Sequence, residues 1–510
     1  MMFQGKRALA VGLLAGALTA LAMPPLHWLP LAILGIVVFI RQWDTSLTPR
    51  MALLRGWAWG LGYFAVGSYW IVEAFFVPPA DFEFLGPPMV VGLALLLGLY
   101  PGLAAGGTRW LALRWPILAG RGARLLLLAI AWTVMEWLRG HMFTGYPWNP
   151  LGHVWAFTPA LLQSAALFGV YGLGTLTFIV LGAPAAGWRA AAVGLAVVGL
   201  AGWFGMKVMP PVDAAADGPI VRIVQPNTPQ AEKWQPGTEV PEMRKLLALS
   251  HRPGFEKLAA VIWPETAVPF IVTPDSPALP TLAMAAPPGG YLLTGAIRAT
   301  KRRADGVWNS LLAIDQGGAI VAYYDKVHLV PFGEYIPFHK DLAPLAGLIG
   351  RGSFEIGDGQ VTLAPPGLPA FSPVICYEVI FPGAVTGPGA RPRWLLNITN
   401  DAWFGLSTGP YQHFTSARLR TIEEGLPMIR AANTGVSAVI DAYGRVLVSL
   451  DMEQQGIIDH AIPPARAATP YAQWHDWTLL VLIIVLAVAM IVTGWCEMRF
   501  GSGRLRPTKL

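Results

Sequence analysis

Three residues whose side chains could carry out one reaction follow short apolar segments in the second half of the chain. Glu265 ends "VIWPE", Lys326 ends "YYDK", and Cys376 lies in "SPVICYE". A thiol can attack a carbonyl carbon, a carboxylate can accept the proton of the thiol, and an ammonium can stabilise the resulting oxyanion. Positive charge beside the thiol would also lower its pKa. These residue types therefore suit acyl transfer.

Each of the three residues also has a structural explanation when it is considered alone. A lone cysteine at a strand end is commonly a small buried hydrophobe. The other cysteine, Cys496, lies in an apolar C-terminal stretch, so no disulfide is expected. Glu265 could be a turn carboxylate and Lys326 a solvated hairpin residue. Their order and their common position at strand ends favour a site, because active-site loops of α/β sheets converge there.

Residues 207–472, which should position these side chains, have ordinary charge density and many turn signals. Their short runs of β-branched residues predict strands, and residues 411–425 have helical character. Repeated strands with intervening helices predict an α/β layered domain. The expected strands are 220–227, 259–265, 291–297, 309–315, 371–378, 393–401 and 434–441.

Residues 1–206 and 473–510 have a different composition that indicates membrane helices. The whole chain is 54% hydrophobic and only 13% charged, against about 25% charged in soluble domains. Runs of about 17–25 apolar residues are long enough to cross a bilayer. The sequence predicts a polytopic α-helical membrane domain of seven helices, then an eighth helix and a basic tail after the α/β domain. The predicted spans are 7–23, 27–42, 54–76, 88–111, 122–138, 160–184, 188–206 and 474–496.

The basic residues predict how these helices are oriented. The net charge is +6, and Lys and Arg gather in alternate joints, with Arg139 as the exception. By the positive-inside rule both termini are cytoplasmic and residues 207–472 lie on the opposite, periplasmic side. The basic excess thus reflects topology, and we expect no nucleic-acid binding. The residues on the predicted cytoplasmic side are Lys6, Arg7, Arg41, Arg50, Arg109, Arg114, Arg121, Arg124, Arg189, Arg499, Arg504, Arg506 and Lys509.

The first apolar run has a second interpretation. Two basic residues, an apolar stretch and "ALAM" at 20–23 also fit a signal peptide with a small-residue cleavage site. Cleavage would leave seven spans without changing the orientation of the rest. The joint at Pro24-Pro25 leads directly into another span, which favours retention.

Longer motifs surround the three reactive residues. They are "KVHLVPFGEYIPF" at 326–338, "ICYE" at 375–378 and "NITNDAWFG" at 397–405. With the order Glu, Lys, Cys, they make residues 218–460 resemble the nitrilase superfamily, and in particular its membrane-bound branch, the apolipoprotein N-acyltransferases. The predicted helices extend this resemblance to essentially the whole chain. It implies an αββα nitrilase-like sandwich for the α/β domain.

The resemblance also implies roles for individual residues. Glu265 would be the general base, Lys326 the stabiliser of the tetrahedral intermediate, and Cys376 the nucleophile that holds the acyl group as a thioester. Glu334, in "FGEY", would support Lys326 and the nucleophile, although a structural ion pair would also explain this glutamate.

Three more positions match the family on either side of these residues. Tyr377 and Glu378 follow the nucleophile, and the backbone N–H of Tyr377 would be an oxyanion donor. Trp234, in "QAEKW", matches a tryptophan on a mobile substrate-binding loop, and its alternative is an exposed loop aromatic. The apolar stretch 342–350 would dip into the bilayer or cover the site, and its alternative is a buried loop.

The resemblance implies the substrates and the compartment as well. The acyl donor would be a membrane phospholipid such as phosphatidylethanolamine, and the acceptor the N-terminal amine of a diacylglyceryl-cysteine apolipoprotein. The reaction would be the last step of lipoprotein maturation in the inner membrane of a Gram-negative bacterium, with ping-pong kinetics. We expect a monomer without a cofactor. No metal site is expected either, because the sequence has no HExxH or paired CxxC motif.

Two other interpretations compete with an acyltransferase. A membrane-tethered amidase would use the same three residues with water as the acyl acceptor, although a small-amide hydrolase would not need so many apolar segments. A transporter with an accessory domain would need ionisable groups inside the spans. Glu136 and Arg139 come nearest, at the end of the fifth predicted span.

Overall fold

The chain divides into two compact units. The structure, a computed structural model, describes residues 5–77, 83–211, 218–233, 235–300, 306–336 and 354–500. One unit comprises Met1–Val72, Phe84–Pro210 and Pro470–Leu510, and the other comprises Glu73–Glu83 and Pro211–Thr469. The hydropathy pattern does not predict that Glu73–Glu83 belongs to the second unit, because apolar segments of the first unit precede and follow it in the sequence.

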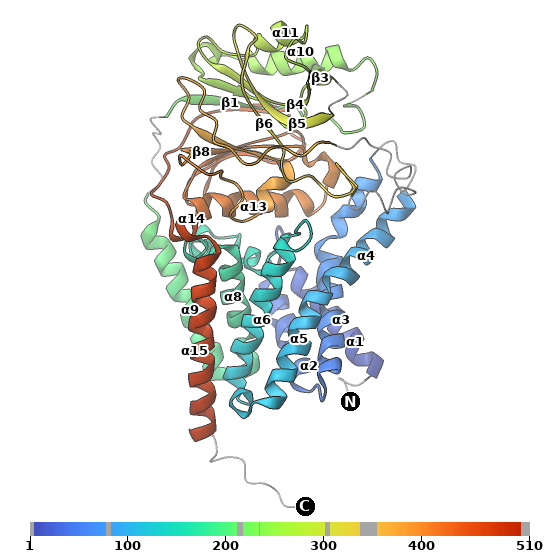
Figure 1. The fold of residues 1–510 in the computed structure, drawn as a ribbon, viewed down its shortest axis with the longest axis vertical. Helices are drawn as coiled ribbons and strands as arrows, with labels where there is room; N and C mark the ends of the chain where they lie inside the picture. The colour runs from blue at the N-terminus through green and yellow to red at the C-terminus, as the bar shows by residue number, and fades with distance from the viewer. Residues whose placement is uncertain are drawn as a thin grey trace, which may run out of the picture. The chain divides into compact units, whose positions relative to one another are not determined.

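The first unit is helical (Figure 1). Among the described residues, four segments are long and apolar enough to cross a membrane: Glu83–Arg114, Ala165–Ala186, Trp188–Val208 and Asp476–Arg499. The first two helices have 16 residues each, which is about 24 Å of helix. The main helices are α1 (Gly5–Ala20), α2 (Leu29–Asp44), α3 (Pro49–Gly67), α4 (Gly86–Leu97), α5 (Leu99–Arg114), α6 (Arg121–His141), α7 (Pro159–Leu162), α8 (Ala165–Ala186), α9 (Trp188–Val208), α14 (Pro470–Trp474) and α15 (Asp476–Phe500).

Glycines allow α1 and α3 to approach closely. A Cβ atom at Gly16 would overlap the backbone of Trp59, and one at Gly62 would overlap the backbone of Leu13. Small residues at such crossings let helix backbones pack directly against each other, which is typical of helices that associate in membranes.

The ionisable pair Glu136 and Arg139 near the end of α6 is buried, with each residue 3% exposed. Glu136 Oε1 lies 3.8 Å from the Arg139 guanidinium and accepts a hydrogen bond of 2.8 Å from the backbone N–H of Leu151. Arg139 donates to the carbonyl of Trp148 at 2.7 Å. Because these partners are main-chain groups of the segment that follows α6, the pair has a structural explanation and gives no support to a transport pathway.

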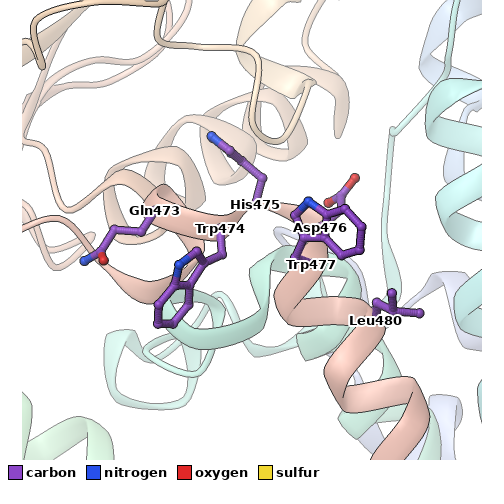
Figure 2. Close-up of a pocket in the computed structure, with 6 residues that line it drawn as sticks. All are labelled: Gln473, Trp474, His475, Asp476, Trp477 and Leu480. Carbon is purple, nitrogen blue, oxygen red and sulfur yellow. The ribbon is translucent and has the colours of Figure 1, made fainter.

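The junction of α14 and α15 forms a shallow hollow with an aromatic rim (Figure 2). Trp474 and Trp477 are 60% and 72% exposed. Asp476 accepts a hydrogen bond of 2.6 Å from the indole of Trp137, which ties the start of α15 to α6. Exposed tryptophans at the end of an apolar helix are typical of the membrane–water interface. The hollow is lined by Gln473, Trp474, His475, Asp476, Trp477 and Leu480.

The second unit contains two β-sheets. The first has the order β12-β1-β2-β4-β5-β6, with β3 beside β4, and the second has the order β11-β10-β9-β8-β7. The strands β1, β2 and β4 are parallel to one another, as are β7, β8 and β9. The strands are β1 (Ile220–Gln225), β2 (Ala260–Ile262), β3 (Ile271–Val272), β4 (Tyr291–Ala299), β5 (Val307–Asp315), β6 (Ile320–Asp325), β7 (Phe371–Ile375), β8 (Trp394–Thr399), β9 (Met428–Ala432), β10 (Ser437–Ile440), β11 (Val446–Leu450) and β12 (Gly456–Ala461).

Helices cover the outer faces of both sheets, which gives four layers (Figure 1). α10 (Glu239–Ser250) and α11 (Leu279–Ala283) pack on the first sheet, and α13 (Gly409–Glu424) lies on the second. A buried apolar core joins the facing sheets, with Leu311 from one and Ile398 from the other. Parallel strands covered on both faces are buried along their whole length, as β7 and β8 are. The predicted α/β sandwich is confirmed.

Candidate active site

Cys376 lies at a strained turn between a strand and a short helix. The strand predicted for residues 371–378 ends at Ile375, and Cys376 begins a 3₁₀ segment, Cys376–Ile380. Its φ of 49° is in the left-handed region, which non-glycine residues seldom adopt and which is common at functional sites. Cys376 is a free cysteine and only 6% exposed. A buried cysteine alone could be core filler, but the backbone at this position indicates a constrained side chain.

Glu378 holds this turn in place. One carboxylate oxygen accepts from the backbone N–H of Ile375 at 2.7 Å. The other accepts from the N–H of Val327 and from the hydroxyl of Tyr324, both at 2.7 Å. Burial raises the pKa of Glu378, and these hydrogen bonds oppose the shift. The carboxylate thus joins the Cys376 turn to the residue that follows Lys326.

Lys326 lies between two carboxylates. Its Nζ is 2.9 Å from Glu334 Oε1 and 3.4 Å from Glu265 Oε1. The amide of Asn309, on β5, donates to the same two oxygens at 2.9 Å and 2.7 Å. Burial alone would lower the pKa of Lys326, but Glu334 and Glu265 raise it above its ordinary value. Lys326 is therefore a permanently charged ammonium next to the candidate base.

The thiol of Cys376 is electrostatically coupled to this cluster. Burial raises its pKa well above the ordinary value, Glu265 raises it further, and Lys326 acts in the opposite direction. The sequence led us to expect positive charge to lower this pKa, and Lys326 does act in that direction, but burial has the larger effect. Desolvation of the thiolate outweighs the effect of the ammonium, so burial favours the protonated thiol.

Glu265 is fixed through its other oxygen and through its backbone. Its Oε2 accepts from the N–H of Asn400 at 2.9 Å. The ammonium of Lys233 donates to the Glu265 carbonyl at 3.1 Å and to the hydroxyl of Thr266 at 2.9 Å. Asn309, Asn400 and Lys233 were not predicted as site residues, although Lys233 lies in "QAEKW" and Asn400 in "NITNDAWFG".

A buried network of charged and polar residues contacts the backbone of Cys376. His413, on α13, has Nε2 3.0 Å from the carbonyl oxygen of Cys376 and Nδ1 2.8 Å from Asp401 Oδ1. Arg430 donates to the other oxygen of Asp401 at 2.7 Å. Burial would raise the pKa of Asp401, but Arg430 and His413 hold it below its ordinary range. Asp401 is therefore a carboxylate at neutral pH.

The same network contains a combination of residue types found in metal sites. The ligand atoms of Cys376, Asp401 and His413 lie within 4.8 Å of one another. Arg430 and the bond between Asp401 and His413 already use the carboxylate and imidazole atoms. This gives the cluster an explanation without a metal, and the expectation of no metal site stays a prediction.

The remaining predicted site residues are placed only in part. Tyr377 directly follows Cys376 and packs edge-on against Phe381, with ring centroids 5.1 Å apart. Its role as an oxyanion donor stays a prediction. Trp234 and the apolar stretch 342–350 lie outside the described residues.

Two parts of the chain match known protein families. Residues 220–471, which contain every strand of the sandwich, match the carbon–nitrogen hydrolase family. Residues 15–183 match the N-terminal domain of apolipoprotein N-acyltransferase. The class of protein is therefore a carbon–nitrogen hydrolase domain attached to an apolar helical unit.

Curated relatives define the family within this class. The apolipoprotein N-acyltransferase of Rhodopseudomonas palustris is 37% identical, covering 96% of this chain and 95% of that protein. The one of Bradyrhizobium diazoefficiens is 39% identical with the same coverage. The chain belongs to the apolipoprotein N-acyltransferase family. Among solved structures, a CN-hydrolase superfamily protein from Xanthomonas campestris is similar at 23% identity and a TM-score of 0.37, covering 48% of this chain and 91% of that chain.

Proposed function

We propose that the protein transfers an acyl chain from a membrane phospholipid to the N-terminal amine of a diacylglyceryl-cysteine apolipoprotein. The observation that carries the proposal is the position of Lys326, which contacts Glu265 and is electrostatically coupled to the buried thiol of Cys376. Membership of the apolipoprotein N-acyltransferase family supports the choice of substrates.

In the first half-reaction, Glu265 accepts the proton of the Cys376 thiol as sulfur attacks the ester carbonyl of the phospholipid. The raised pKa of the thiol makes this general-base step necessary. The ammonium of Lys326 stabilises the tetrahedral oxyanion. When the C–O bond breaks, Glu265 returns the proton to the departing alkoxide, which leaves as a lysophospholipid, and a thioester remains on sulfur.

In the second half-reaction, the lipoprotein amine attacks the thioester carbonyl. Glu265 accepts the proton of the attacking nitrogen, the oxyanion again forms beside Lys326, and the C–S bond breaks. The sulfur takes the proton back from Glu265. One amide bond replaces one ester bond, and the enzyme returns to its starting state.

The membrane setting follows from both substrates being lipids. We propose that the apolar helices span the bacterial inner membrane eight times, with both termini cytoplasmic. The sandwich would then be periplasmic. The asymmetric distribution of basic residues along the chain supports this orientation. The proposed enzyme is a monomer.

The decisive experiment separates the two half-reactions. The purified protein is incubated in phospholipid nanodiscs without lipopeptide, and the peptide containing Cys376 is analysed by mass spectrometry. We expect an added acyl mass that disappears when a diacylated lipopeptide is supplied. Rapid release of free fatty acid without an adduct would contradict the proposal and favour the amidase-like hydrolase.

A further inference from the structure

A second buried ammonium lies beside the candidate base. Lys233 is 4% exposed, and its Nζ donates to the Glu265 carbonyl at 3.1 Å and to the Thr266 hydroxyl at 2.9 Å. Thr266 has a φ of 44°, in the left-handed region that a β-branched residue rarely adopts. The two hydrogen bonds of Lys233 therefore hold the strained turn that carries the Glu265 side chain.

The burial of this lysine is costly, which argues against an incidental role. Both of its hydrogen-bond acceptors are neutral oxygens. The ammonium of Lys233 is therefore removed from water without a hydrogen-bonded carboxylate to offset the cost. Burial lowers the pKa of Lys233 to about 8, with Glu265, Glu242 and Cys376 opposing the shift. A surface lysine could anchor a loop without this cost.

A second contact joins the segment that precedes Lys233 to the same turn. Gln230 Oε1 accepts from the Asn400 side chain at 2.6 Å, and the backbone N–H of Asn400 donates to Glu265 Oε2 at 2.9 Å. One loop therefore reaches the Glu265 backbone through Lys233 and the Glu265 carboxylate through Asn400. Asn400 is held from a second side as well, because its Oδ1 accepts from the Asn433 side chain at 3.0 Å.

We propose that Lys233 is a positioning residue for Glu265, and that its ammonium fixes the turn that directs the Glu265 carboxylate toward Lys326 and the thiol. Loss of the proton from Lys233 weakens both hydrogen bonds and releases the turn. The charged or titratable groups that face it are Glu265, Glu242 and Cys376, and Glu242 is also paired with Lys245 at 2.7 Å. This inference rests on the proposed role of Glu265 in acylation.

The test measures how the acylation rate of Cys376 depends on pH. A Cys496→Ser background leaves one cysteine, and phosphatidylethanolamine nanodiscs without lipopeptide supply the acyl group. With Lys233 intact, we expect the rate to fall as pH rises through about 8, because the ammonium is lost there. Lys233→Met should acylate about 10- to 100-fold more slowly at pH 7, since the base is misplaced, and should lack the alkaline fall.

Two further variants make the test specific. Lys233→Arg keeps a charge that is not titrated in this range, so the alkaline fall should move to higher pH. If a thermal unfolding assay shows that Lys233→Met is not folded, Lys233→Arg still tests the proposal. Lys257→Met removes an exposed lysine of the same unit and should leave the profile unchanged.

The outcomes separate this inference from the proposed function. If the protein with Lys233 intact forms no acyl-cysteine, the proposed function fails. If it does, and Lys233→Met or Lys233→Arg keeps the same alkaline fall with the same midpoint, the positioning role is overturned. A uniform decrease at every pH, with the fall retained, also contradicts it, because a merely structural lysine would behave in that way.

Discussion

Lys326 Nζ lies closer to Glu334 than to Glu265, at 2.9 Å against 3.4 Å. The charge of the ammonium is therefore balanced mainly by Glu334, and Glu265 is not held in a tight ion pair. Asn309 contacts an oxygen of each carboxylate, so the two are kept in a fixed relation. This difference supports our proposal of separate tasks for the glutamates, in which Glu334 orients the lysine and Glu265 exchanges protons.

Replacement of the nucleophile should stop the reaction without unfolding the protein. Cys376→Ser keeps a small side chain at the buried turn but offers a hydroxyl, which is a weak nucleophile without strong activation. We expect no acyl-enzyme by mass spectrometry and no transfer to lipopeptide, with normal membrane insertion. Cys496→Ser, at the other cysteine, should keep full activity. Normal transfer by Cys376→Ser would exclude the nucleophile assignment.

The two glutamates beside Lys326 should differ in their effects on kinetics. Glu265→Gln removes the group that exchanges protons, so kcat should fall about 10²- to 10⁴-fold at every pH. Glu334→Gln keeps the base but loosens the ammonium that stabilises the oxyanion, so the loss should stay within about 10²- to 10³-fold. Both are measured by transfer to a fluorescent lipopeptide.

A matched control for these two variants is Glu355→Gln, which changes an exposed glutamate of the same unit. It should retain the kcat of the unmodified protein. Equal losses in Glu265→Gln and Glu334→Gln, with unchanged pH profiles in both, would argue against separate tasks.

The sequence could predict the chemical groups because each one follows a strand. Short β-branched runs identified the ends of β2, β6 and β7, and the order Glu265, Lys326, Cys376 suggested a site. The same pattern predicted an α/β layered domain, and the family resemblance implied the αββα sandwich. The span boundaries could not be predicted to the residue, because α1 begins and ends before the run 7–23 does, and α2 begins and ends after the run 27–42 does.

The supporting residues could not be predicted, because their roles depend on contacts distant in sequence. Glu265 and Asn400 are 135 positions apart, and Cys376 and His413 are 37 apart. Nothing in the local pattern distinguishes Lys233 from a solvated loop lysine. The net direction of the Cys376 pKa shift could not be predicted either, because the burial of a side chain cannot be deduced from the residues next to it in the sequence.

Glu378 should be more important for stability than for chemistry. Its carboxylate accepts from Ile375, Val327 and Tyr324, so Glu378→Gln would turn an amide N–H₂ toward at least one of these donors. An unsatisfied buried group costs about 1–3 kcal/mol. We expect a lower midpoint of thermal unfolding and a reduced kcat with little change in KM. Tyr324→Phe, which removes one donor, should be milder, and an unchanged midpoint in Glu378→Gln would refute this role.

Asp401 should make the stability of the protein sensitive to acid. Arg430 and His413 hold its pKa below the ordinary range in the folded state, whereas in the unfolded chain it would titrate near 4. Its stabilisation is therefore complete above about pH 4 and is lost as pH falls toward the folded-state pKa. Asp401→Asn should lower the thermal midpoint at pH 7, because Arg430 loses its buried partner, at a cost of about 3–5 kcal/mol. As pH falls below about 4 toward the folded-state pKa, the difference from the unmodified protein should shrink. The variant Asp358→Asn, at an exposed position, serves as the control and should have the thermal midpoint of the unmodified protein at every pH. If the difference in midpoint between Asp401→Asn and the unmodified protein stays constant as pH falls, Asp401 is not the group responsible.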